Sequence, residues 1–214
     1  SNTNKVMFLA DSSGEYGIDT GSSLPQLINK LKEKVRSDIQ IGISQLNPEH
    51  FIKYNNQMLD LIKSGTIIYI NIPIQSASNN ILSSMHRKYN YEQIDKLFSD
   101  FNKIKFRNFS THLLFGFPGE KESDAKKSIN FIIKHSPRHV VASAFMPHPA
   151  IEASGYKNQI SKDEVERRIK RCEEELIKHG IKVATDWGSV TNKIMNRIKF
   201  SLGLELKDYR VGPK

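Results

Sequence analysis

The strongest constraint on the fold is a regular alternation of strand-like and helix-like segments. In this chain of 214 residues, short apolar runs begin near residues 6, 39, 66, 109 and 139, with helical patterns between them, one of which predicts a helix over residues 48–65. The starts lie roughly 30 residues apart, which is about the length of one strand–helix unit in a parallel barrel. This period predicts right-handed crossovers and a parallel sheet. A complete eightfold barrel needs about 250 residues, so the sequence predicts an α/β fold with about five parallel strands of a partial TIM-type (β/α) barrel.

The later part of the chain differs in character. Residues 161–180 form one amphipathic helix that begins with the capping box Ser161-Lys-Asp-Glu164. Cys172 lies on its apolar stripe, so we expect a buried structural thiol. We assign residues 1–150 to the barrel and residues 151–214 to a C-terminal helical extension, which includes a predicted helix near Val190–Phe200.

Composition limits the classes of function. The net charge is +9, and the surplus is spread along the chain, which favours a basic solvated surface over a dedicated polyanion-binding arm. A single cysteine excludes a cysteine-ligated iron–sulfur cluster or a cysteine-rich zinc site held by this chain alone. The chain contains no apolar run of about 20 residues, so we expect a cytoplasmic protein with no membrane segment. It begins Ser1-Asn2 rather than with Met, and we therefore expect a piece of a longer protein.

Unusual residues follow the expected strands, where parallel βα sheets bind their ligands. Each residue has an ordinary explanation: glycines serve turns, Gln75 and Ser76 cap a helix, and Arg87 is a solvated charge. Taken together, neutral hydrogen-bonding groups, glycine turns and one arginine suit a ligand with ribose hydroxyls, an adenine edge and a carboxylate. The candidate residues are Asp11, Ser12, Tyr16, Asp19, Ser44, Gln75, Ser76, Arg87, Gly116, Phe117, Pro118, Gly119, Glu120 and His148.

Four short motifs follow one another along residues 11–120. Asp11…Tyr16-Gly17…Asp19, Ile72-Pro-Ile-Gln-Ser-Ala-Ser78, Met85-His-Arg-Lys-Tyr89 and Phe115-Gly-Phe-Pro-Gly-Glu120 resemble the radical S-adenosylmethionine enzymes. Within them the chain looks most like the methylthiotransferase branch, which modifies tRNA or a ribosomal protein. The resemblance covers about residues 5–150 and implies a partial (β/α)6 barrel that binds S-adenosylmethionine at the carboxyl ends of its strands.

The resemblance also implies roles for individual residues. Ser44 and Gln75 would lie near the ribose, with Ser76 beside them, and Arg87 would pair with the methionyl carboxylate. The loop 116–120 would offer backbone groups to the adenine. Asp11, Ser12, Tyr16, Asp19 and His148 would line the substrate side. In that family a 4Fe–4S cluster, reduced by a donor such as flavodoxin or ferredoxin, cleaves S-adenosylmethionine to a 5′-deoxyadenosyl radical.

Three departures from the family pattern qualify these expectations. The three-cysteine cluster motif is missing, so this chain would be a catalytic-core piece that is inert without it. Ala77 stands where the family usually has Gly. The segment after residue 150 does not read like the family's RNA-binding β-barrel.

Two other functions fit parts of the sequence. A TIM-type acid/base enzyme acting on a phosphorylated or sugar-like substrate would use Asp11, Glu15 or Glu120 as carboxylates and His148 as a base. Alternatively, a barrel without a cluster would serve as an RNA- or protein-binding module, with the steep salt dependence that phosphate contacts produce.

Overall fold

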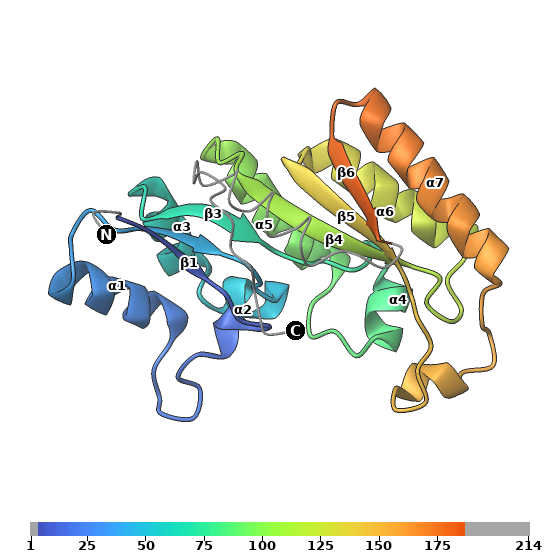
Figure 1. Cartoon of the computed structure of the whole chain (residues 1–214), viewed down its shortest axis with the longest axis horizontal. Helices are drawn as coiled ribbons and strands as arrows, with labels where there is room; N and C mark the ends of the chain where they lie inside the picture. Colours follow the sequence, from blue (N-terminus) through green and yellow to red (C-terminus); the bar gives the residue numbers. More distant parts are fainter. Residues whose placement is uncertain (1–3, 187–214) are drawn as a thin grey trace, which may run out of the picture.

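The protein forms a single parallel sheet of six described strands, arranged in chain order (Figure 1). The computed structural model describes residues 4–186. The strands are β1 (Lys5–Phe8), β2 (Gln40–Ile43), β3 (Ile67–Asn71), β4 (Phe109–Phe115), β5 (His139–Ala144) and β6 (Lys182–Asp186). All neighbouring pairs are parallel, which confirms the predicted α/β class and the partial-barrel arrangement.

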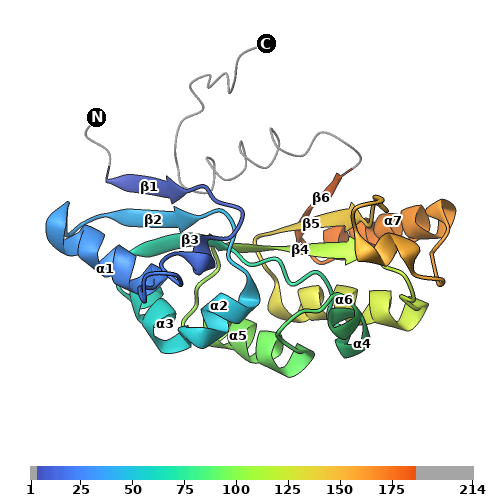
Figure 2. The same cartoon turned by 90° about the horizontal axis from the view of Figure 1, so that it is seen from below.

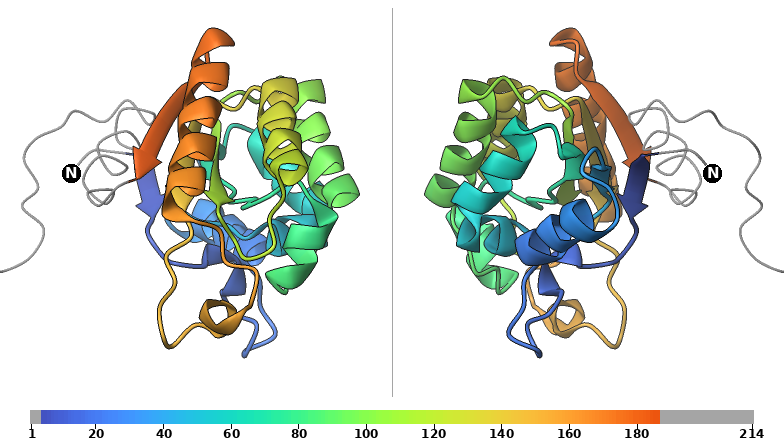
Figure 3. Two further views of the ribbon diagram at one scale, coloured as in Figure 1. Left: turned by 90° about the vertical axis from the view of Figure 1, so that its right-hand side faces the viewer. Right: turned by 90° about the vertical axis from the view of Figure 1, so that its left-hand side faces the viewer.

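The helices connect these strands and gather on one face of the sheet (Figure 2). They are α1 (Leu24–Lys34), α2 (Pro48–Lys53), α3 (Asn55–Lys63), α4 (Asn79–Ser84), α5 (Tyr91–Lys103), α6 (Glu122–His135) and α7 (Lys162–Lys178), with short 3-10 turns η1 (Ser13–Glu15) and η2 (Glu152–Gly155). Viewed from either end, helices α1 to α6 lie to one side of the strands (Figure 3). Between residues 4 and 186, no helix is long and apolar enough to cross a membrane.

Aromatic residues fill the space between the sheet and the helices. Phe98 of α5 lies 5.1 Å from Phe109 of β4 and 5.4 Å from Phe131 of α6, measured between ring centroids. All three side chains are buried. Alternate residues of β4 face the other side of the sheet, where Ser110 and His112 take part in polar contacts. The period of two in β4 therefore places Phe109 on the helix-facing side, and Ser110 and His112 on the opposite side.

The structure corrects the sequence-based expectations in two places. The helix expected over residues 48–65 is two helices, because Tyr54 leaves the helical backbone region (φ −115°, ψ 29°) between α2 and α3. The expected five strands become six, because β6 pairs with β5 in register from His139↔Lys182 to Ser143↔Asp186.

The segment beyond residue 150 thus adds strand β6 to the same sheet. It also contains helix α7, which packs against β4, β5 and β6. The division of the chain at residue 150 stays a prediction. The helix expected near Val190–Phe200 lies outside the described residues. Cys172 is fully buried on α7, as expected, and burial raises the pKa of its thiol to about 12.

Candidate functional site

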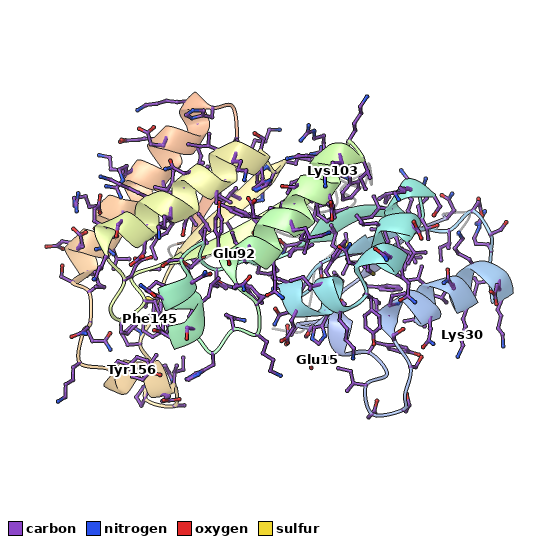
Figure 4. All side chains as sticks on the ribbon, turned by 180° about the vertical axis from the view of Figure 1, so that it is seen from behind. Glu15, Lys30, Glu92, Lys103, Phe145 and Tyr156 are labelled. Carbon is purple, nitrogen blue, oxygen red and sulfur yellow. The ribbon has the colours of Figure 1, made fainter. Side chains whose placement is uncertain are left out.

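The loops that follow the strands meet at one edge of the sheet, because all strands are parallel. Figure 4 shows Glu15, Phe145 and Tyr156 along this edge, with Lys103 at the opposite end of the molecule. The edge contains the segments that the sequence singled out, namely 11–19, 44–47, 73–78, 116–120 and 146–149. The structure therefore brings the predicted loops to the same side of the sheet.

Gln75 is held in an unusual backbone conformation. Its φ of 64° lies in the left-handed region, which residues with a side chain seldom adopt. Its amide donates to the His112 carbonyl at 2.9 Å, and its carbonyl accepts from the Leu114 amide at 2.8 Å. These two bonds extend the pairing with β4 and fix the point from which the Gln75 side chain extends. Strained residues that are held in this way are frequent at ligand sites.

Ser76 is turned toward helix α6. Its side chain is fully buried, and its hydroxyl lies 3.4 Å from the Ser128 hydroxyl. The Ser128 hydroxyl also accepts from the Ala77 amide at 3.0 Å, and the Ser78 hydroxyl donates to Asp124 at 2.7 Å. Ala77 itself is 1% exposed, so the turn has room only for a small side chain. Ser76 thus fixes the loop to α6, and its expected contact with a ligand stays a prediction.

Arg87 carries a buried donor with no partner among the described residues. It follows α4, and its amide donates to the Leu82 carbonyl at 2.9 Å. Its Nε is buried and makes no hydrogen bond. The neighbouring Tyr89 is buried, and its hydroxyl donates to the Ile74 carbonyl at 3.2 Å; burial raises the pKa of this phenol. A buried charged donor without an acceptor is costly, so an anionic ligand group is the expected complement.

Ser44 directly follows strand β2 and is hydrogen-bonded to residues on the polar face of the sheet. Its amide donates to the Phe8 carbonyl at 3.0 Å, and its carbonyl accepts from the Asn71 side chain at 2.9 Å. The Asn71 amide nitrogen also lies 3.2 Å from Nε2 of His112. Because the His112 carbonyl accepts from Gln75, one polar network connects Ser44 with Gln75. The two residues predicted to lie near a ribose are therefore positioned by common contacts.

The loop 116–120 is closed by its own glutamate. The Gly116 amide donates to Oε2 of Glu120 at 2.8 Å, and the Gly119 amide donates to the Asn158 carbonyl at 2.8 Å. Phe117 and Pro118 are buried, with the Phe117 ring 5.2 Å from the Phe145 ring. The carbonyls of Phe117 and Glu120 also accept hydrogen bonds, so among the described residues the carbonyl oxygens of Gly116, Pro118 and Gly119 are the ones that the loop can offer a ligand.

Glu120 is enclosed rather than presented to a substrate. Its side chain is 1% exposed, and Arg168 donates to its carboxylate at 2.8 Å. Burial raises the pKa of this carboxyl, while the hydrogen bonds from Gly116 and Arg168 oppose the shift. A carboxylate with these partners is not positioned for proton transfer to a substrate, which removes one of the three candidate carboxylates of the acid/base alternative.

The remaining predicted residues lie in exposed parts of the edge. Asp11, Tyr16, Asp19 and His148 are exposed, and Ser12 is half-buried. Nδ1 of His148 accepts from the Ala150 amide at 3.2 Å. Their expected role on the substrate side stays a prediction.

The structure adds polar residues that the sequence did not single out as site candidates. Side-chain atoms of Ser13, Asn47 and His50 are buried without a hydrogen-bond partner among the described residues. The Ser13 amide donates to the Gln45 carbonyl at 3.2 Å, which joins η1 to the loop between β2 and α2. Nε2 of His50 lies 3.5 Å from Oε1 of Glu49. In the sequence, the signal for Asn47 was its place in the short loop between an expected strand and Pro48.

An iron–sulfur cluster does not fit the residues that the structure describes. Within residues 4–186, no three or more His, Cys, Asp and Glu side chains are grouped as metal ligands require. Cys172 lies within the packed face of α7, and its thiol is held in the protonated form by burial. The described residues therefore include the candidate loops but no cluster ligands.

Comparison with known proteins identifies the family. The model of the radical SAM superfamily matches residues 19–132, which is more than half of the chain. The chain belongs to the radical SAM superfamily. A probable threonylcarbamoyladenosine tRNA methylthiotransferase of Pyrococcus horikoshii is 28% identical over 155 residues, covering 72% of this chain and 36% of that protein. The Homo sapiens threonylcarbamoyladenosine tRNA methylthiotransferase is 26% identical over 153 residues, covering 70% and 26% respectively.

These relatives confirm the expected resemblance to the methylthiotransferase branch. The chain spans about a third of the length of the Pyrococcus relative that it matches. Among solved structures, Elp3 of Methanocaldococcus infernus superimposes with a TM-score of 0.61 at 15% identity, covering 94% of this chain and 55% of that one. Coproporphyrinogen III oxidase of Escherichia coli, a radical SAM enzyme, gives 0.58 at 16% identity, covering 72% and 36%. At these identities, the comparison shows that this chain shares the fold of both solved structures.

Proposed function

We propose that this chain is the S-adenosylmethionine-binding part of a methylthiotransferase that acts on threonylcarbamoyladenosine in tRNA. The substrate is inferred from the names of the curated relatives. The binding role rests on one observation above all: at the carboxyl edge of the sheet, the buried Nε of Arg87 has no acceptor among residues 4–186. S-adenosylmethionine carries a carboxylate that would complete this donor.

The other groups at the edge suit the rest of the same ligand. Gln75 and Ser44, connected through Asn71 and His112, would hold the ribose hydroxyls. The carbonyl oxygens of loop 116–120 would accept from the adenine amine. Asp11, Ser12, Tyr16, Asp19 and His148 would face the RNA substrate. When bound, S-adenosylmethionine supplies the reactive sulfonium, and this chain's residues bind and orient it.

Cluster chemistry is not assigned to this chain. Its one cysteine is buried on α7, so we propose that the chain by itself does not cleave S-adenosylmethionine. In the whole protein, the 4Fe–4S cluster and its electron donor, a flavodoxin or ferredoxin, would act from outside the described residues. Anaerobic reconstitution of the chain should then give well below one iron atom per chain, and about four would contradict this proposal.

The binding role is tested by calorimetric titration of the chain with S-adenosylmethionine. Replacing Arg87 with Met should weaken binding about tenfold or more, because a hydrogen bond to a charged group contributes about 1.5–3 kcal/mol. Lys88→Met is the matched control, since Lys88 is the exposed neighbouring cation. It should bind within about twofold of the unaltered chain. Absence of binding by the unaltered chain, or equal affinities for both variants, would refute the proposal.

A further inference from the structure

We propose that Arg168 of helix α7 is a positioning residue for the loop 116–120. The inference rests on the proposed function for the identity of the ligand, but the contact itself is independent of it. Arg168 lies outside residues 19–132, the part matched by the superfamily model. A segment outside the part matched by the superfamily model would therefore set the shape of the proposed S-adenosylmethionine loop.

A short chain of hydrogen bonds connects Arg168 to the backbone of the loop. Its Nη1 donates to Oε2 of Glu120 at 2.8 Å and to the Glu120 carbonyl at 3.0 Å. The same Oε2 accepts from the Gly116 amide at 2.8 Å. Arg168 thus holds both ends of the loop, one directly and the other through the carboxylate. Its Nε donates to Glu164 at 2.7 Å, which fixes the guanidinium from its own helix.

Burial makes the stability of the loop sensitive to the loss of either partner in this contact. The side chains of Arg168 and Glu120 are 6% and 1% exposed. Loss of one partner from a buried ion pair leaves an uncompensated charge, which is far less favourable than the intact pair. With Arg168 removed, we expect the Glu120 carboxylate to turn toward water. The Gly116 amide would then lose its acceptor.

An apolar contact reinforces the same connection. Gly116 has a φ of 81°, and a Cβ built on it would lie 2.3 Å from Cγ2 of Val165, one turn before Arg168. In addition, the Gly119 amide donates to the Asn158 carbonyl at 2.8 Å. Three contacts from residues 158–168 therefore hold a five-residue loop. Within the described residues, the carbonyl oxygens of Phe117 and Glu120 already accept hydrogen bonds. The carbonyl oxygens of Gly116, Pro118 and Gly119 are therefore the ones left for a ligand, and their direction depends on α7.

The variants compare two adjacent arginines. Arg168→Met removes the buried donor and keeps much of the side-chain length. Arg167→Met is the matched control, since Arg167 is 60% exposed and pairs with Glu164 at 2.6 Å on the surface of the same helix. Arg168→Lys retains the charge but cannot reach Glu120 and Glu164 with one planar fork.

The first measurement reads the loop directly. Phe115-Gly116 is the only Phe-Gly pair in the chain, so carbonyl-13C phenylalanine with 15N glycine selects one amide signal by NMR. The Gly116 signal should move in Arg168→Met, move less in Arg168→Lys, and keep its place in Arg167→Met. This readout does not require a ligand, so it tests the contact even if the proposed function is wrong.

The second measurement is the affinity for S-adenosylmethionine. We expect about a tenfold loss in Arg168→Met, the size of one lost hydrogen bond to the ligand, and an intermediate loss in Arg168→Lys. The Arg167→Met variant should bind within about twofold of the unaltered chain. An unmoved Gly116 signal or unchanged affinity in Arg168→Met would overturn the proposal. If that variant does not fold, the same two readings on Arg168→Lys decide the matter.

Discussion

Gly116 offers a quantitative test of how closely α7 approaches the loop. The residue combines two constraints: a positive φ of 81° and a would-be Cβ position 2.3 Å from Cγ2 of Val165. Gly119, three residues later, has nearly the same φ of 84° but no heavy atom within 4 Å of its would-be Cβ. Replacing each glycine with alanine therefore separates the backbone effect from the steric effect.

The expected magnitudes follow from these contacts. The left-handed backbone costs an alanine about 1 kcal/mol, and this applies to both positions. Gly116→Ala must also displace Val165, and overpacking of a buried site costs about 1–3 kcal/mol more. We expect the free energy of unfolding to fall by about 1 kcal/mol for Gly119→Ala and by about 2–4 kcal/mol for Gly116→Ala.

The assay is urea-induced unfolding followed by circular dichroism at constant pH. A third variant, Val165→Ala, removes the obstructing methyl groups. Combined with Gly116→Ala it should destabilise by less than the sum of the single changes, with a coupling of about 1–2 kcal/mol. Equal losses at the two glycines, or additive effects at Gly116 and Val165, would refute the close packing of α7 on the loop.

Two further predictions concern buried titratable groups. The Cys172 thiol should react with Ellman's reagent at pH 8 only after the chain is unfolded, because burial raises its pKa to about 12; rapid reaction of one thiol per native chain would contradict this. Burial lowers the pKa of His135 below its ordinary value of about 6.5. Nε2 of His135 lies 2.8 Å from Oδ1 of Asp95, and the same carboxylate also pairs with Lys134. The unfolded chain then takes up this proton first, so stability should decline as the pH falls below about 6.5. The decline measured by urea titrations between about pH 7 and 5.5 should be smaller in His135→Asn, and an unchanged slope would show that His135 is not responsible.

The local sequence was sufficient to predict the features that depend on a repeated pattern of apolar residues. Strand–helix alternation predicted the parallel sheet, and the apolar stripe of residues 161–180 predicted the burial of Cys172. The same alternation placed the candidate loops at one edge, because parallel strands all end on the same side. These features depend on the periodicity of neighbouring residues, which a sequence displays directly.

The sequence was insufficient where short segments depend on their neighbours in space. The run Lys182–Asp186 is short and partly polar, yet it forms β6 because β5 offers an open edge. Conversely, the apolar pattern of residues 48–65 continues through Tyr54, where the backbone interrupts the helix. Pairing partners and backbone breaks of this kind are fixed by packing, and hydrophobic spacing does not record them.

The direction in which side chains point at the site was decided only by the tertiary structure. Ser76 and Glu120 stand in loops that the sequence singled out as candidates, yet both side chains turn inward. Ser76 faces Ser128, and Glu120 faces Arg168, which lies 48 residues further along the chain. Sequence determines that polar groups and glycines stand after each strand. Whether such a group meets a ligand or a partner within the chain depends on distant residues that desolvate it, since a buried charge must find its complement wherever the fold places one.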